Sequence, residues 1–477
     1  MILPPLPAPK AAAVALPEGD PWVAAFHHAC TLQSEGQDAA ARTAFEGLLQ
    51  WAPAGHLTRA PAWSNLGLLL EAQGQRHAAR EAWLQALQAD ARCFEAALHL
   101  GQWWMREPAA DAPAQAEAWL QRAAQLQPAS PSPWSALGGL LMAQHRDADA
   151  QACLRQALQC DPEHGGARFN LGTLLLRHGQ HEAGWACLES RDSLTPLVRQ
   201  LPWPRWGGEP LAGRRLLLVA DAGHGDVLQM WRYRRWLHEA STVDAWVQEA
   251  LIPLLAAQPG RHPDARLYAL GEPWPAGAPE PDLWAPIMSL PWLCGLQHPE
   301  ALSPQGWGRS PDLVCPGHPL PWPPRGAAQP LRVGLVARGN PRHENDADRS
   351  MHQPDPWRPL REAVAASGAH VEWVDLLAGP PWQDFAQVAQ AMQGLDLLIT
   401  VDTAYAHLGG ALGCLTWVLL PHWFTDWRWG AAGEASAWYP QGMRLFRQAR
   451  RGDWAGVLAQ VAQAWPGLSA GRTPPPA

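Results

Sequence analysis

The sequence predicts a helical solenoid in its first part, followed by two doubly wound α/β units, a fold class of α plus α/β. Three observations lead to this prediction. A Leu-Gly pair recurs at intervals near 34 residues in the first part. Short apolar runs, glycine-rich loops and helical stretches alternate in the second part. The 477 residues also exceed one hydrophobic core, since domains usually contain about 100 to 200 residues.

The composition fits a folded protein that does not bind nucleic acid. Its 47% hydrophobic and 17% charged residues are ordinary for a globular chain. The formal net charge of -8 provides no overall positive field for a phosphate backbone, so we expect no nucleic-acid partner. Lys10 is the only lysine. An anionic ligand would therefore be held by arginine, backbone amides or histidine.

The cysteines and the apolar runs do not indicate an exported or membrane-spanning chain. The eight cysteines form no Cys-x-x-Cys pair, which is typical of reduced, buried thiols. The longest apolar run, about 411–420, is shorter than the roughly 20 residues that span a bilayer. We interpret the proline-rich residues 1–19 as a disordered leader and expect a cytoplasmic protein without a transmembrane segment.

The first folded element is a helical repeat array at residues 20–192. Its anchors are Leu66-Gly67, Leu100-Gly101, Leu137-Gly138 and Leu171-Gly172, at intervals of 34, 37 and 34 residues. Large residues follow each of the first three anchors at similar distances, namely Trp83, Leu120 and Leu154. Small residues suit close helix crossings, and large ones fill the groove between repeats. About five repeats fit, and their pattern resembles the tetratricopeptide family.

The resemblance to tetratricopeptide repeats implies a surface for another protein. Such solenoids have a concave face that usually binds a peptide or a protein segment. A purely structural role for the array is the alternative.

The second part of the chain divides into two α/β halves. A linker rich in proline and glycine covers 193–213, the first half covers 214–325, the second half covers 330–466, and a disordered tail covers 467–477. Candidate strands begin at Arg214, Val243, Ala265, Leu331, His370, Asp396 and Thr416. Helical stretches between several of them predict parallel sheets, and a proline-rich passage separates the two halves.

In parallel sheets ligands bind beyond the carboxyl ends of the strands. The first candidate site is therefore the loop Asp221–Asp226, where Gly223, His224 and Gly225 precede Asp226. The glycines allow a tight turn against a ligand. Asp226 is either a general base for an acceptor hydroxyl or a helix N-cap, and its spacing alone favours the cap.

The second candidate site follows the strand that begins at Asp396. Thr403 lies where a helix would begin, so its hydroxyl and the free amides there could hold a diphosphate. Asp402 precedes it, and His407 lies one helical turn further along. An Asp-Thr capping pair with a histidine that makes only local contacts is the alternative.

The third candidate site follows the strand that begins at Leu331 and is rich in hydrogen-bond donors. Its residues are Arg338, Asn340, Arg342, Arg349 and Ser350. Two or more arginines beside a strand end suit a phosphate-rich ligand, although a solvated polar loop would have the same composition. We expect no metal or other cofactor, with arginines and helix ends taking the ligand's charge.

Aromatic residues are concentrated in the segment 422–429, after the strand that begins at Thr416. Their rings could stack on a base or a sugar, or they could pack between the two halves.

Five motifs together resemble a known family: GHGDVLQMWRY, GLVARGNPRHENDADRS, VDTAYAHLGGALG, PHWFTDWRWG and SAWYPQGMRLFRQARRGDW. They resemble bacterial glycosyltransferases that carry tetratricopeptide repeats, with a C-terminal region similar to the heptosyltransferases of family 9. This resemblance implies a GT-B fold of two Rossmann-like halves, with acceptor and nucleotide sugar on the first and second half, and an inverting transfer in the cleft between them.

The resemblance also assigns roles to residues of this chain. Asp226 matches the aspartate proposed as the general base of the family, and Asp402, Thr403 and His407 match its nucleotide-sugar motif. Heptosyltransferases generally place a lysine on the donor phosphate. This region has none, so Arg338, Arg342 or Arg349 would have to replace it.

Three functions follow from these observations. The first is a protein glycosyltransferase whose repeats capture an acceptor protein, flagellin being one type known for related enzymes. The second is a transferase for lipopolysaccharide or another glycan. The third is a scaffold whose transferase half has lost its activity.

Overall fold

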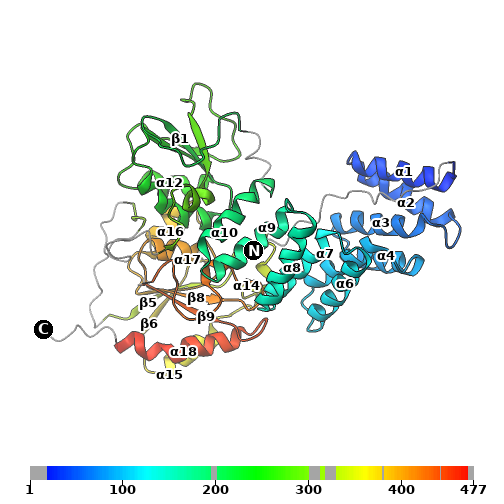
Figure 1. The fold of residues 1–477 in the computed structure, drawn as a ribbon. Coiled ribbons are helices and arrows are strands. Elements are labelled where there is room, and N and C mark those ends of the chain that lie inside the picture. The colour runs from blue at the N-terminus through cyan, green and yellow to red at the C-terminus, as the bar shows by residue number, and fades with distance from the viewer. Residues whose placement is uncertain are drawn as a thin grey trace. The chain divides into compact units, whose positions relative to one another are not determined.

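A computed structural model describes residues 19–194, 201–299, 312–316, 329–378, 381–440 and 442–470. The expected leader lies outside these residues, apart from Gly19. The chain forms two compact units, one ending at Leu171 and the other beginning at Gly172. Figure 1 shows the elements in chain order.

The first unit is an array of paired helices. They are α1 (Pro21–Ser34), α2 (Asp38–Trp51), α3 (Arg59–Ala72), α4 (Arg76–Ala89), α5 (Phe94–Met105), α6 (Ala112–Leu126), α7 (Pro131–Ala143) and α8 (Asp147–Cys160). Helix α9 (Gly165–Arg177) crosses the division between the units, and α10 (His181–Leu188) lies in the second unit.

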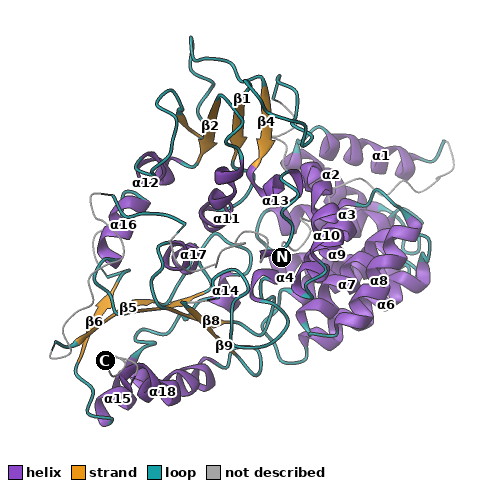
Figure 2. Cartoon of the chain, turned by 60° about the vertical axis from the view of Figure 1, so that its left-hand side comes forward, coloured by secondary structure: helices purple, strands orange, loops and turns teal. Residues whose placement is uncertain are grey.

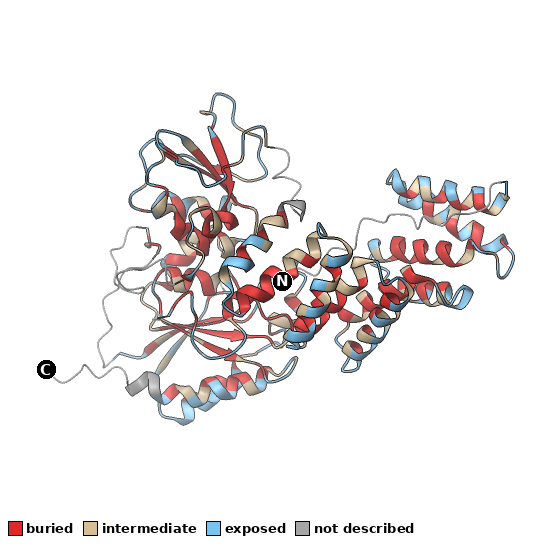
Figure 3. Ribbon diagram, in the orientation of Figure 1, coloured by how far each residue is buried: buried red, intermediate tan, exposed pale blue. Residues whose placement is uncertain are grey.

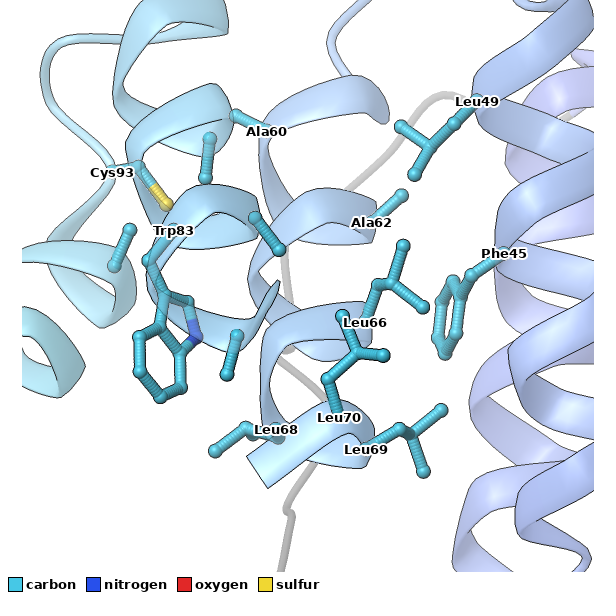
Figure 4. Close-up of a cluster of buried hydrophobic side chains, with 14 of the residues drawn as sticks. Phe45, Leu49, Ala60, Ala62, Leu66, Leu68, Leu69, Leu70, Trp83 and Cys93 are labelled. Atoms are coloured by element: carbon cyan, nitrogen blue, oxygen red, sulfur yellow. The ribbon is translucent and has the colours of Figure 1, made fainter. Parts of the chain in front are cut away.

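The repeated glycines allow the two helices of each pair to pack closely. A Cβ added to Gly101 would lie 2.5 Å from Leu120 Cγ, and one added to Gly138 would lie 2.5 Å from Leu154 Cγ. Trp83 takes the equivalent place against Gly67 and is 1% exposed. These contacts confirm the expected close crossing of helices at the small residues, and they place the large residues against glycine within a pair. Figure 4 shows Trp83 within the buried cluster that α2, α3 and α4 share with neighbouring helices.

The second unit contains two parallel sheets. The first comprises β1 (Arg215–Val219), β2 (Thr242–Val247), β3 (Leu267–Ala269) and β4 (Leu283–Pro286), in the order β3-β2-β1-β4. The second comprises β5 (Leu331–Val336), β6 (Val371–Asp375), β7 (Leu397–Val401), β8 (Thr416–Leu420) and β9 (Met443–Arg447), in the order β6-β5-β7-β8-β9.

Continuous apolar runs form the central strands. Val219 is fully buried, as is every residue of β7 and β8 in the second sheet, and Figure 3 shows the strands as largely buried. All seven candidate strands are present. The strands β4 and β9 were missed because β4 has four residues ending in proline, and β9, at the sheet edge, alternates with arginines.

Helices lie on both faces of the second sheet. Figures 1 and 2 show α12 (Ile252–Ala256), α16 (Phe385–Met392) and α17 (Ala404–Ala411) between the two sheets. On the other face of the second sheet, α15 (Arg358–Ala366) packs against α18 (Trp454–Ala470). Helix α18 continues into the range 467–477 that was expected to be a disordered tail. The rest of that range lies outside the described residues.

The expected linker is partly packed. The end of the array continues into a 3-10 turn, η1 (Glu189–Leu194). Further on, the backbone N–H of Trp206 donates to Trp284 O of β4 at 2.8 Å, and Arg205 forms an isolated parallel bridge with Trp284. Residues 201–213, which are rich in proline and glycine, therefore form no helix and yet contact the first sheet.

Candidate active site at the carboxyl ends of two sheets

Each sheet has a point at which the strand order reverses. In the first sheet this point lies between β1 and β4, and in the second it lies between β5 and β7. Ligands of open parallel sheets bind in the crevice beyond the carboxyl ends of the strands at such points. The loop 220–226 follows β1, the segment 337–350 follows β5, and Asp402 follows β7. All three candidate sites therefore lie at points where the strand order reverses.

Residues that follow a strand of the first sheet contact residues that follow a strand of the second sheet. Arg428, in the 3-10 turn η7 (Trp427–Trp429) that follows β8, forms an ion pair with Asp226 of α11 (His224–Met230). Helix α11 also packs against α17. A Cβ on Gly225 would lie 2.8 Å from His407 Cδ2 and 3.3 Å from Ala404 Cα, so glycine allows this close approach.

Asp226 is the third residue of α11, so it is not the N-cap, which is Gly223. Its Oδ2 accepts the backbone N–H of Gly223 at 2.8 Å, as the third residue of a capping box does. Its Oδ1 accepts a hydrogen bond from Arg428 Nη2. The carboxylate therefore takes part in capping α11 as its third residue rather than as the N-cap, and it also contacts a residue of the second half. Its role as a general base stays a prediction.

Thr403 is the N-cap of α17, and its side chain is largely buried. Its Oγ1 accepts the N–H of Tyr405 at 3.3 Å and lies 3.3 Å from Thr400 Oγ1. The capping contact of the alternative interpretation is thus present. Because a hydroxyl can donate as well as accept, this contact leaves hydrogen-bonding capacity for a ligand.

His407 is a buried, neutral packing residue. Its Nδ1 lies 3.2 Å from Tyr439 Oη, and its ring stacks on Trp429 with centroids 5.1 Å apart. Burial, followed by the positive charge of Arg428, lowers the pKa of His407 to about 3. It can therefore order the wall of the site but does not supply a positive charge to an anion near pH 7.

The buried carboxyl groups of Asp402 and Asp426 influence each other's charge beside Arg428. Burial, and then the charge of Asp426, raise the pKa of Asp402 to about 6. Burial acts on Asp426 in the same direction, but Arg428 outweighs it and holds the pKa of Asp426 well below its usual range. Arg428 Nη1 lies 3.1 Å from both oxygens of Asp426. Asp402 is thus the member of the pair that takes up a proton first as the pH falls.

The segment after β5 brings one arginine to the site and leaves two in solvent. Arg349, at the end of the turn α14 (Asp346–Arg349), lies across Gly339, where an added Cβ would be 2.8 Å from its Nη2. Its side chain is 13% exposed, its Nε has no hydrogen-bond partner among the described residues, and Asp346 Oδ1 lies 3.8 Å away. Arg338 and Arg342 are exposed.

The remaining predicted residues of this segment shape the loop. Ser350 Oγ accepts the N–H of Gly339 at 2.9 Å and donates to Asp346 Oδ1 at 2.6 Å, which holds the two ends of the loop together. Asn340 is exposed, and its Oδ1 accepts the N–H of Arg342 at 3.0 Å.

Two cavities adjoin the site. One, of about 600 Å³, is lined by His224 and Gln248 from the first half and by Gln383 and Asp384 from the second. The other, of about 370 Å³, includes Leu376, Trp382, Phe385 and Tyr405. His224 stacks on Phe385 with ring centroids 5.3 Å apart, and burial lowers the pKa of His224. The second cavity has the flat aromatic and apolar walls that suit a ring-shaped ligand group.

Two segments of the helical array match family models for the tetratricopeptide repeat, residues 60–93 and residues 153–186. The N-terminal array is built of tetratricopeptide repeats. No curated protein matches the chain.

Solved structures similar to part of the chain include several tetratricopeptide proteins. One is a thermophilic protein from Thermus thermophilus, with 19% identity over 37% of this chain and 95% of its own, and a TM-score of 0.32. PilF of Pseudomonas aeruginosa has 16% identity over 36% of this chain and 75% of its own, also with a TM-score of 0.32. YrrB, described as having an unusual peptide-binding site, has 19% identity over 36% of this chain and 87% of its own, with a TM-score of 0.28.

The last tetratricopeptide helix packs within the second unit. Trp185 of α10 is fully buried, with its ring edge-on to Trp427 at 5.3 Å and its Nε1 donating to Gln297 O at 3.0 Å. Arg191 of η1 donates to Asp221 Oδ2 and to Ser289 Oγ, both at 2.7 Å. Asp221 follows β1 and Ser289 follows β4. Arg191 therefore connects the residues after the two strands between which the order of the first sheet reverses.

Sequence reasoning missed Asp426 and Arg428 because it treated the segment 422–429 only as a source of aromatic rings. Trp427 and Trp429 are buried and pack against Trp185 of α10 and His407 of α17, so these two ring contacts do not lie between the two halves. The available signal was the Asp-x-Arg pattern directly after a buried strand, since charged residues at that place face the ligand edge.

Among the described residues, no group of three or more His, Cys, Asp or Glu side chains could hold a metal ion. Within the same ranges no helix is long and apolar enough to cross a membrane.

Proposed function

We propose that the second unit is a glycosyltransferase with a GT-B arrangement. It transfers a sugar from a nucleotide-sugar donor to an acceptor protein that the tetratricopeptide repeats capture, and it acts in the cytoplasm. Tetratricopeptide arrays usually bind peptides or protein segments, which supports a protein acceptor, flagellin being one type. The reaction inverts the configuration of the sugar and uses Asp226 as its base.

The observation that carries this proposal is a contact between the edges of two parallel sheets at which the strands have their carboxyl ends. Asp226 after β1 and Arg428 after β8 form an ion pair, so a ligand at one sheet edge would lie beside residues of the other. A two-substrate transfer needs such an arrangement, because donor and acceptor must be held in the right geometry.

Arg349 and the start of α17 support a site for the donor diphosphate. Arg349 Nε is buried and has no hydrogen-bond partner in the described part of the chain, which is costly, and a phosphate oxygen would satisfy it with a strong, charge-assisted hydrogen bond. Thr403 begins an eight-residue helix, whose dipole favours an anion at this end. In this proposal the arginine and the helix end, rather than a metal ion, take the charge of the leaving group.

The transfer step then balances as follows. The acceptor oxygen forms a bond to the anomeric carbon of the sugar, and its proton passes to the Asp226 carboxylate. The bond between the anomeric carbon and the diphosphate oxygen breaks, and its electron pair leaves on the nucleoside diphosphate. Two of the roughly four lone-pair positions of Asp226 are in use, so acceptor capacity remains for the hydroxyl.

Donor binding is the direct test. We would titrate UDP-glucose, UDP-N-acetylglucosamine, GDP-mannose and ADP-heptose into the full chain and measure heat and melting temperature, because a ligand of the native state raises the latter. Arg349→Gln should weaken the donor that binds by roughly 10-fold or more, as a lost charged hydrogen bond does. Arg361→Gln, which removes an exposed pair with Asp355, should leave affinity unchanged.

Transfer would be followed with the same donors carrying a labelled sugar and with a cell lysate as the acceptor source. Label in protein that requires Asp226 supports the proposal, whereas label only in glycan would favour the lipopolysaccharide or glycan transferase. No donor binding and no transfer would contradict the enzyme assignment.

A scaffold without transferase activity is the second candidate function. One observation favours it: both oxygens of Asp226 are already held, one by Gly223 and one by Arg428. In that case the repeats would bind their partner protein normally, and the nucleotide sugars above would neither bind nor react.

A further inference from the structure

Arg428 is a side chain that links the two halves of the second unit at the candidate site. It is 6% exposed. Its Nε donates to Gln229 Oε1 at 2.5 Å, its Nη2 donates to Asp226, and the same nitrogen lies 3.7 Å from Met288 Sδ. These three partners come from the first half, while Asp426 comes from the second.

These contacts depend on the planar guanidinium group of arginine, whose N–H donors point in fixed directions. Nη1 faces both oxygens of Asp426 at 3.1 Å, and the guanidinium carbon lies 4.3 Å from the centre of the Trp427 ring. Burial would lower the pKa of Arg428, but the carboxylates of Asp226 and Asp426 outweigh it and raise that pKa. Lysine has three donors on a flexible stem and cannot reproduce this planar, many-sided arrangement.

Asp226 is thereby fixed from two directions. Gly223 holds Oδ2 from the helix start, and Arg428 holds Oδ1 from the other half. A general base works only when it is held within hydrogen-bond reach of the proton that it removes, and small displacements are costly. Resting on the transfer reaction proposed above, we propose that Arg428 is the residue that positions Asp226 against the acceptor hydroxyl.

The test compares Arg428→Lys and Arg428→Gln with a matched control, Arg215→Lys. Arg215 makes a two-point ion pair with the buried Asp244, but it lies at the amino end of β1, away from the ligand edge. Rates would be measured as release of nucleoside diphosphate at a saturating donor concentration. The acceptor would be the fraction of the cell lysate that takes up label in the transfer experiment above. Donor affinity and melting temperature would be measured on the same preparations.

We expect Arg428→Lys to lower kcat by roughly 10-fold or more while donor Kd changes by less than about threefold, because orientation rather than donor binding is lost. Arg428→Gln should lose more than Arg428→Lys, since it also removes the charge. Arg215→Lys should keep kcat within about twofold of the wild-type value, since the ion pair between Arg215 and Asp244 lies away from the candidate site and acts only on stability.

A double variant separates positioning from a general structural role. If Arg428 acts through Asp226, adding Arg428→Gln to Asp226→Asn should lower kcat by less than about twofold further, because residues that act as a unit are strongly non-additive. An equal loss of kcat in both backgrounds would overturn the positioning role.

The outcomes also distinguish this role from the proposed function. Donor binding with full kcat in Arg428→Lys would overturn the role of Arg428 and leave the transferase intact. Absence of both donor binding and transfer in the wild type would overturn the transferase assignment, and the role of Arg428 in it.

Discussion

At the scale of single residues, Asp226 has the sharpest consequence for chemistry. In Asp226→Asn the amide oxygen can still accept the N–H of Gly223, but the side chain can no longer take a proton. We expect transfer to fall by about 100-fold or more, within the range that general base catalysis usually supplies. Donor Kd should stay near the wild-type value. A fully active Asp226→Asn protein would remove this residue from the mechanism.

Asp402 gives a prediction about pH and stability. Its folded pKa, raised by burial and by Asp426, lies above the ordinary value of a free aspartate. A carboxyl with a raised folded pKa stabilises the fold most below its unfolded pKa, and that stability is lost as pH rises through the folded pKa. Between about pH 4 and pH 6 the wild type should therefore lose stability relative to Asp402→Asn, which stays neutral.

Chemical unfolding of both proteins at several pH values measures this difference. The free energy of unfolding of the wild type, relative to that of Asp402→Asn, should fall from about pH 4 to about pH 6 and then level off. A gap that does not depend on pH would show that Asp402 titrates as it does in the unfolded chain.

At the scale of elements, the repeats depend on glycines where two helices touch. Gly101→Ala would place a Cβ 2.5 Å from Leu120 Cγ and 3.2 Å from the Leu120 backbone nitrogen. Overpacking of this kind costs about 1 to 3 kcal/mol. Gly47→Ala is a matched control, because this glycine is also within a helix but has no atom within 4 Å of an added Cβ.

We expect the Gly47→Ala array to gain up to roughly 1 kcal/mol, since alanine favours helix over glycine. Thermal unfolding of both variants, monitored by circular dichroism, provides the measurement. Equal stability of Gly101→Ala and Gly47→Ala would mean that α5 and α6 can move apart without a cost in free energy.

At the scale of the whole molecule, the end of the array belongs structurally to the second unit. Arg191 pairs with Asp221, whose side chain is 1% exposed, and Trp185 is buried against Trp427. A fragment that begins at Ser193, in the expected linker, would leave Asp221 without this partner. Breaking a buried ion pair in this way costs about 3 to 5 kcal/mol.

We therefore expect a fragment from Gly165 to the C-terminus to unfold cooperatively and one from Ser193 to be much less stable or to aggregate. Size-exclusion chromatography and thermal unfolding of the two fragments test this. Equal melting temperatures would show that α10 and η1 contribute little to the second unit.

From local patterns alone, the amino-acid sequence predicts the helical array, seven of the nine described strands and the sheet edges where ligands would bind. The 34-residue period predicts the helical array because equivalent glycines must meet equivalent large side chains, such as Gly101 and Leu120. Continuous apolar runs predict buried parallel strands, and the residues after β1, β5 and β7 follow directly from them. Both signals are local in the chain, so they can be read without knowing the fold.

The pairing of these residues depends on the three-dimensional fold. Arg428 reaches Asp226 across 202 positions of sequence, and no local pattern identifies that partner. His407 is neutral and Asp402 holds its proton more tightly because folding removes water and brings in particular charges. Arg338 and Arg349 look equivalent in the sequence, yet only Arg349 is turned toward Gly339 and largely buried. Burial and charge proximity depend on contacts between distant segments, which the order of residues alone does not specify.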